Sequence, residues 1–253
     1  MFEEPFRWME AISTRHSYVR EKLQGGQPVI AVPYQDGALM LGFSPQPGKI
    51  FEVYDRIAMG GMGHPADVEK MRMTLLDMAH LEGFNRSAQD VTIARMLQFG
   101  IAPALKQNFE EVQRAPYLIK LLLLELDPDG KPNFFRLNYD GYWETLNQGG
   151  SIAGDDKVME WIDKKMEETP FATFPLDKAL TEVCKLWEEG KNQIARGEDK
   201  EDETPELSIG LKEAFEKWNL EAAVLSASTD RRSIYRTLNP KEIEKLKTAV
   251  LKQ

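Results

Sequence analysis

Few residues of this chain have both the type and the spacing that chemistry requires. The three histidines, His16, His64 and His80, are not spaced as metal ligands, and Cys184 is the only cysteine. Neither a structural metal site nor an internal disulfide is therefore expected. The glycine-rich run at 60–63 lacks the Gly-Lys-Ser/Thr ending that holds a triphosphate. We expect no metal and no cofactor.

The composition limits the class of partner. Acidic residues outnumber basic ones, 41 to 32, which gives a formal net charge of −9 and no basic face for nucleic acid. The most apolar stretch, 118–126, is too short to span a bilayer, and the opening Met-Phe-Glu-Glu-Pro does not resemble a signal peptide. We expect a cytoplasmic protein without a membrane or nucleic-acid partner.

Hydrophobic periodicity predicts alternating groups of helices and strands. The pair Asp36-Gly37 predicts a hairpin between two β-rich runs, and Ser87 or Asp90 could cap the second long helix. Residues 196–205 are acidic and predict a solvated loop. This order suits an α+β sandwich with helices outside two sheets. Strands are predicted at 28–34, 38–43, 49–54, 57–62, 117–126, 134–137, 142–146, 220–225 and 233–236, and helices at 6–23, 65–83, 87–108, 154–168, 175–196 and 239–253.

Three blocks of sequence carry a resemblance. They are a Lys-Ile-Phe strand with an acidic turn at 49–57, an Arg-Ala-Pro-Tyr segment at 114–117 before an Asp-Pro-Asp-Gly turn at 127–130, and a strand followed by a helix start at 235–243. Each lies at the right place in the element order, and together they resemble proteasome subunits of the α type, especially bacterial ones. The resemblance implies the four-layer αββα sandwich of N-terminal-nucleophile hydrolases.

That resemblance also implies how the chain is organised. It implies one domain over 1–253, in which residues 1–24 form a gate segment and helix, 25–238 the sandwich, and 239–253 a C-terminal helix. It further implies a homo-oligomeric ring, by family likeness a heptamer, that stacks on catalytic β subunits and meets a ring-shaped AAA+ ATPase activator.

The positions used for catalysis by this family are largely lost. Catalytic members expose a threonine at the head of the first strand, where its hydroxyl and its own amine act together. The matching position here is Gln27, and no Thr, Ser or Cys occurs between Val19 and Phe43. Phe43 aligns with the acidic partner, and Lys49 with the supporting lysine. An amide cannot serve as the nucleophile, so we expect no catalytic residue in this chain.

The amphipathic helix before the first strand favours the α type. A chain that must be cleaved to expose its first strand has no use for such a helix, whereas α-type subunits keep one. The resemblance implies that Phe2, Glu3, Glu4 and Pro5 lie near the pore as gate residues. An ordinary N-terminal core helix is the alternative interpretation.

Lys49 has a different role in α-type subunits. The resemblance implies that its ammonium pairs with the terminal carboxylate of an activator's C-terminal tail, in a pocket between neighbouring subunits. A surface lysine at a strand start is the plain alternative. The competing functions are a divergent self-contained hydrolase with an unrecognised nucleophile, which would need removal of residues 1–26, and an unrelated binding module, which would be a monomer.

Overall fold

The computed structural model describes residues 5–45, 48–193, 210–228 and 234–252. The strands are β1 (Val29–Tyr34), β2 (Gly37–Ser44), β3 (Ile50–Tyr54), β4 (Ile57–Gly63), β5 (Ile119–Leu126), β6 (Pro132–Asn138), β7 (Trp143–Leu146), β8 (Gly150–Ile152), β9 (Asn219–Ser226) and β10 (Tyr235–Thr237). The helices are α1 (Pro5–Leu23), α2 (Pro65–Asn85), α3 (Ile93–Met96), α4 (Ala102–Glu110), α5 (Asp156–Glu168), α6 (Leu176–Lys191), α7 (Leu211–Lys217) and α8 (Pro240–Leu251). Short helical turns lie at Ala88–Asp90, Leu97–Ile101 and Phe171–Thr173.

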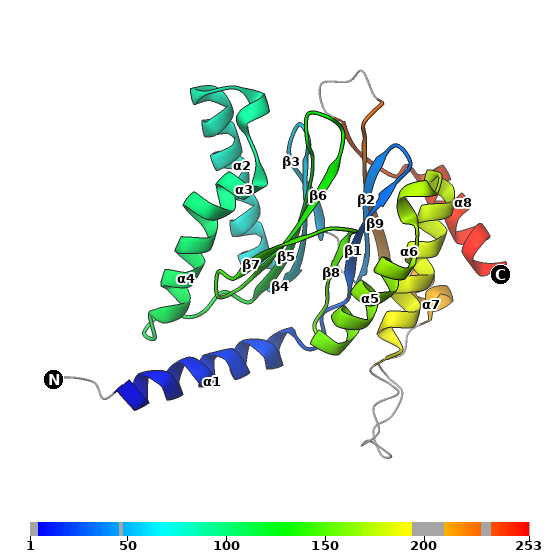
Figure 1. Cartoon of the computed structure of the whole chain (residues 1–253). Coiled ribbons are helices and arrows are strands. Elements are labelled where there is room, and N and C mark those ends of the chain that lie inside the picture. The colour runs from blue at the N-terminus through cyan, green and yellow to red at the C-terminus, as the bar shows by residue number, and fades with distance from the viewer. Residues whose placement is uncertain (1–4, 46–47, 194–209, 229–233, 253) are drawn as a thin grey trace, which may run out of the picture.

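The strands form two antiparallel sheets that face each other. The first has the order β10-β9-β2-β1-β8 and the second the order β3-β4-β5-β6-β7. Helices α2, α3 and α4 cover the outer face of the second sheet, and α5, α6, α7 and α8 lie outside the first (Figure 1). This arrangement confirms the predicted α+β sandwich with four layers.

Two apolar layers follow from the alternation of side chains along β1 and β2. Val29, Ala31 and Met40 belong to the core between the sheets. Ile30 and Leu41 belong to the core between the first sheet and its helices. Both strands are buried on both faces, which explains why their sequences are almost continuously apolar.

The predicted hairpin between β1 and β2 is confirmed. Tyr34 pairs with Gly37 across a turn of two residues. Gly37 has a φ of +142°, and a Cβ there would lie 2.1 Å from the carbonyl oxygen of Leu225. Glycine is therefore needed both for the turn and for the close approach of β9.

The cap of the second long helix was predicted wrongly. Ser87 and Asp90 bond each other through their side chains in a short turn, and the helix begins later. Thr92 is the N-cap, since its side chain accepts a hydrogen bond from the Arg95 N–H. The buried carboxylate of Glu125 accepts from the Ile93 N–H at 2.7 Å, and burial raises the pKa of Glu125.

The first sheet has a short edge strand that the sequence did not reveal. β8 pairs with Val29–Ala31 only, so it covers half of β1 and stops before Pro33. α7 was also missed. The predicted acidic loop at 196–205 lies outside the described residues.

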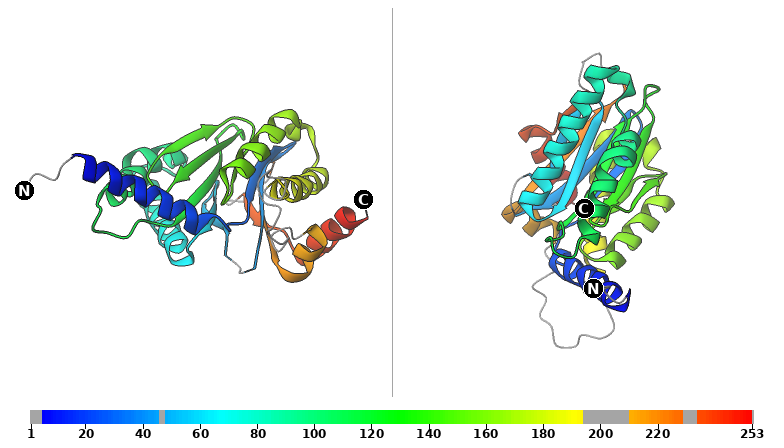
Figure 2. Two further views of the ribbon diagram at one scale, coloured as in Figure 1. Left: turned by 90° about the horizontal axis from the view of Figure 1, so that it is seen from below. Right: turned by 90° about the vertical axis from the view of Figure 1, so that its left-hand side faces the viewer.

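Helix α1 lies across one end of the sandwich. Figures 1 and 2 show it running past the ends of the sheets, with its N-terminal half extending beyond α4. Its C-terminal half provides the buried side chains Val19 and Leu23. Trp8 and Met9 in its other half are exposed. The helix thus packs on the folded body from Ile12 onward, and its first two turns carry exposed side chains.

Candidate functional site

The first strand begins directly behind α1, with Gln27 at its head. The Gly26 N–H donates to the Leu23 carbonyl at 2.8 Å, and the Gly154 N–H donates to the Gly26 carbonyl at 3.1 Å. A Cβ at Gly154 would lie 2.2 Å from the Leu23 oxygen, so only glycine permits this approach. The backbone that joins α1 to β1 is therefore held in place at both of its ends.

Gln27 and Lys49 lie together, as their alignment to the family site predicts. The Lys49 ammonium donates to the Gln27 carbonyl at 2.9 Å. The Gln27 amide nitrogen donates to the Gly25 carbonyl at 3.3 Å. Burial lowers the pKa of Lys49 to about 8, and the charge of Glu221 opposes this shift. The site presents an ammonium and an amide, and the amide cannot attack a carbonyl carbon.

Phe43 is not part of this site. It is fully buried on the helix-facing side of the first sheet, with its ring 4.6 Å from that of Trp187 and 5.1 Å from that of Phe215. Of the three positions matched to the family's catalytic residues, the fold brings only Gln27 and Lys49 into contact.

Glu221 is the residue at this site that the sequence did not indicate. Its carboxylate, on β9, accepts hydrogen bonds from the backbone N–H groups of Gly48, Lys49 and Ile50 at 2.7, 2.9 and 3.0 Å. The only signal was a glutamate inside an otherwise apolar run, Leu220-Glu-Ala-Ala-Val224. Contact with a strand 171 residues away cannot be read from that run alone.

Arg15 fastens α1 to the end of α4. Its guanidinium donates to the carbonyls of Asn108, Val112 and Arg114 at 3.2, 3.2 and 2.7 Å. It also lies over the ring of Phe109, 5.5 Å from the centroid. The last carbonyls of a helix lack hydrogen-bond partners within the helix and attract positive charge. The Arg15 guanidinium therefore gives the Asn108 carbonyl of α4 a partner while it holds α1 in place.

We predict that Arg15→Ala loosens α1 at a cost of about 2 kcal/mol, since hydrogen bonds from a charged donor are lost. Hydrogen exchange should then speed up over residues 16–23, whereas Arg7→Ala, an exposed change on the same helix, should not alter it. Unchanged protection in the Arg15 variant would contradict the anchoring role.

The histidines are accounted for by packing and capping. His16 packs against Phe109, with the two rings tilted by 52° and their centroids 4.5 Å apart. His64 caps α2 by accepting from the Ala66 N–H. The His80 ring nitrogen lies 2.8 Å from the carbonyl oxygen of Leu76. Among the described residues no group of three or more His, Cys, Asp or Glu side chains could hold a metal ion.

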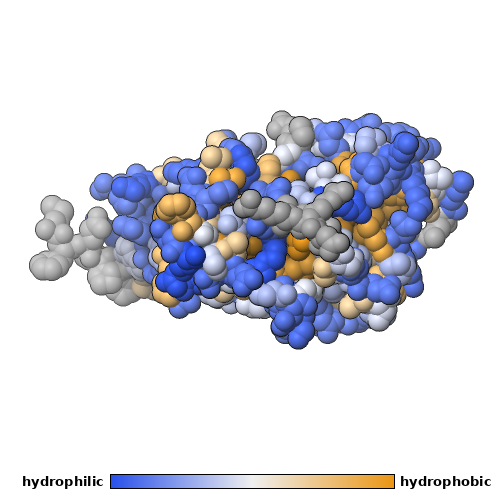
Figure 3. Space-filling model, turned by 90° about the horizontal axis from the view of Figure 1, so that it is seen from above, coloured by the Kyte–Doolittle hydropathy of each residue, from blue (hydrophilic) through white to orange (hydrophobic). Residues whose placement is uncertain are grey.

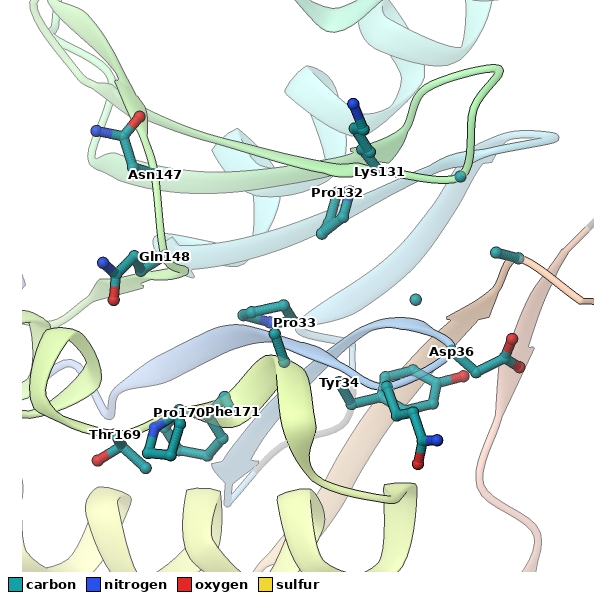
Figure 4. Close-up of a pocket in the computed structure, with 15 residues that line it drawn as sticks. Pro33, Tyr34, Asp36, Lys131, Pro132, Asn147, Gln148, Thr169, Pro170 and Phe171 are labelled. Atoms are coloured by element: carbon teal, nitrogen blue, oxygen red, sulfur yellow. The ribbon is translucent and has the colours of Figure 1, made fainter.

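An open cavity of about 480 Å³ lies at the far end of the sandwich, between the hairpin ends of the two sheets. Apolar residues gather in the hollow on this face (Figure 3). Pro33 from β1 and Pro132 from β6 face each other across it, while the Lys131 side chain points away (Figure 4). Neither Gln27 nor Lys49 lines this cavity.

The comparisons with known proteins decide the family. A family model described as "Proteasome subunit" matches residues 24–182, more than half of the chain. The chain belongs to the proteasome subunit family. The match begins where α1 ends and runs from β1 into the first half of α6, so it includes both Gln27 and Lys49.

Curated relatives carry the name "Proteasome subunit alpha". The one from Thermomonospora curvata is 32% identical over 175 residues, which cover 68% of this chain and 74% of that protein. The one from Actinosynnema mirum is 27% identical over 230 residues, which cover 90% of this chain and 81% of that protein. The one from Streptomyces scabiei is 25% identical over 209 residues, which cover 80% of this chain and 79% of that protein. These relatives confirm the predicted α type, the non-catalytic type of proteasome subunit.

No helix in the described part of this proteasome subunit is both long and apolar enough to cross a membrane.

Proposed function

We propose that this chain forms the outer, heptameric ring of a cytoplasmic 20S proteasome core, stacks on rings of catalytic β subunits and controls the passage of substrates into the particle. The observation that carries this proposal is the position of α1. The helix is anchored by Arg15 and joined by a clamped backbone to the strand head, where a catalytic subunit would need a free amine. The division into 1–24, 25–238 and 239–253 belongs to the same proposal.

The gate is the first part of the proposal. Phe2, Glu3 and Glu4 lie outside the described residues, and Pro5 is the first residue of α1. The N-terminal half of α1 extends beyond the sandwich (Figure 2), so the first turn of the helix lies away from the two sheets. This direction supports a role for residues 2–5 at a shared pore.

Docking of a ring-shaped AAA+ ATPase is the second part. Lys49 is half-buried, and its ammonium contacts a neutral carbonyl oxygen. A terminal carboxylate of the activator would replace this neutral acceptor with a negatively charged one, and a hydrogen bond between two opposite charges is worth about 1.5–3 kcal/mol. Equivalent sites around one ring would add avidity to that modest energy.

Assembly tests the proposal directly. We expect the chain, expressed with a catalytic β subunit, to keep its full mass of 28.9 kDa, to appear as stacked rings in electron micrographs, and to hydrolyse no peptide when expressed alone. Intact-mass spectrometry also separates this function from a self-contained hydrolase. A chain trimmed before Gln27 that cleaves peptides on its own would refute the proposal, as would a monomer that does not bind β subunits.

A further inference from the structure

The start of β3 is held by a side chain from the other sheet. Both carboxylate oxygens of Glu221 are used: Oε1 accepts from the Gly48 N–H, and Oε2 accepts from the N–H groups of Lys49 and Ile50. β9 is in the first sheet and β3 at the edge of the second. Glu221 therefore connects the two sheets at Lys49, the residue whose side chain reaches Gln27 at the head of β1.

The strand register and a glycine turn bring Glu221 and the start of β3 together. Glu221 lies directly opposite Gly42 of β2. Residues directly opposite each other on neighbouring strands share one face and have Cβ atoms about 5 Å apart. Both positions face the second sheet, since Met40 and Ala223, two residues along each strand, belong to the core between the sheets. Gly48, with a φ of +99°, allows the turn that presents three successive N–H groups to one carboxylate.

The contact also determines where the Lys49 ammonium lies. With the Lys49 backbone fixed by Glu221, its side chain extends to the Gln27 carbonyl at 2.9 Å. The carboxylate charge faces backbone N–H donors, so it remains close to the ammonium without pairing with it directly. Burial disfavours the charged form of Lys49, and Glu221 acts in the opposite sense.

We propose that Glu221 is the positioning residue of the docking site, because its carboxylate fixes the start of β3 and orients the Lys49 ammonium toward an incoming terminal carboxylate. This inference rests on the docking role proposed for Lys49. Glu221 does not touch the activator; it acts through Lys49, both by geometry and by favouring the charged ammonium.

Glu221→Gln is the informative variant, because it keeps the shape of the side chain and one acceptor oxygen but removes the charge. The lysine amines of the core particle are labelled with ¹³C-methyl groups, and NMR then follows the titration of Lys49 without any activator. The signal that is missing in Lys49→Arg belongs to Lys49. We expect the midpoint of about 8 to fall in Glu221→Gln and to stay unchanged in Glu168→Gln, an exposed glutamate on α5.

The same particles are then stimulated by the ATPase at two pH values. Stimulation of Glu221→Gln should be about threefold weaker at pH 7.5, because fewer ammonium groups carry a proton, and should recover at pH 6.5. An unchanged titration of Lys49 together with unchanged stimulation at both pH values would overturn the role of Glu221. If Lys49→Ala keeps full stimulation, the docking proposal itself fails, and the role of Glu221 fails with it.

Discussion

Replacing Lys49 by alanine is expected to abolish stimulation by the activator while the rings and the unstimulated peptidase activity remain. Among the described residues the Lys49 ammonium makes one hydrogen bond, to the Gln27 carbonyl, so its loss removes little from the fold. Its loss removes the only cation proposed to meet the activator's carboxylate. A loss of about 2 kcal/mol at each site is about a thirtyfold loss in affinity, and avidity increases it further.

The measurement is stimulated peptidase activity of the mixed particle, with Lys165→Ala as the control. Lys165 is exposed on α5 and pairs with Glu168, so its removal should leave stimulation unchanged. In the wild type, stimulation should also weaken above pH 8, where Lys49 loses its proton, rather than near 10.5, as for an ordinary lysine. Full stimulation of Lys49→Ala would exclude the docking role.

Removing the carboxylate of Asp163 is expected to destabilise the chain by about 3 kcal/mol, because a buried guanidinium would lose a charged partner. Arg136 on β6 is 6% exposed and pairs with both Asp163 and Glu144. It also donates to the Ser151 carbonyl at 2.9 Å, and the Ser151 hydroxyl donates to Asp163 at 2.7 Å. This network joins the second sheet, β8 and α5.

Urea unfolding at a fixed protein concentration measures the free energy lost in Asp163→Ala. The double variant Arg136→Met, Asp163→Leu should be more stable than the single one, since it removes both charges together. Glu168→Ala, which breaks an exposed pair, should leave the free energy of unfolding almost unchanged. A single variant as stable as the wild type would show that Glu144 alone satisfies Arg136.

Most elements could be predicted because each has a local cause. Pro65 begins α2, and the pair Asp36-Gly37 forms the hairpin. The errors came from long-range contacts. Ser87 and Asp90 are good capping residues, but the buried Glu125 from β5 bonds the Ile93 N–H and fixes the helix start later. The three residues of β8 form a strand because β1 lies beside them, and their own sequence does not predict it.

The site was predicted only in part, because some of its contacts are long-range. Gln27 and Lys49 were identified by alignment to a family pattern, and the fold brings them into contact. Phe43 was matched to the same pattern, yet its side chain faces the helices. The carboxylate whose charge raises the pKa of Lys49 comes from Glu221. Which carboxylate approaches a half-buried lysine depends on strand register, which a single sequence does not reveal.

The short edge strand β8 has a consequence for a protein proposed to work in close-packed copies. Beyond Ala31 the rim of the first sheet reaches Pro33, which has no N–H to offer to an additional strand. Copies crowded side by side therefore cannot extend one another's sheets past this point, which guards against aggregation by strand addition. At this edge, neighbours are left to recognise each other through helices and loops, whose side chains distinguish correct partners from wrong ones.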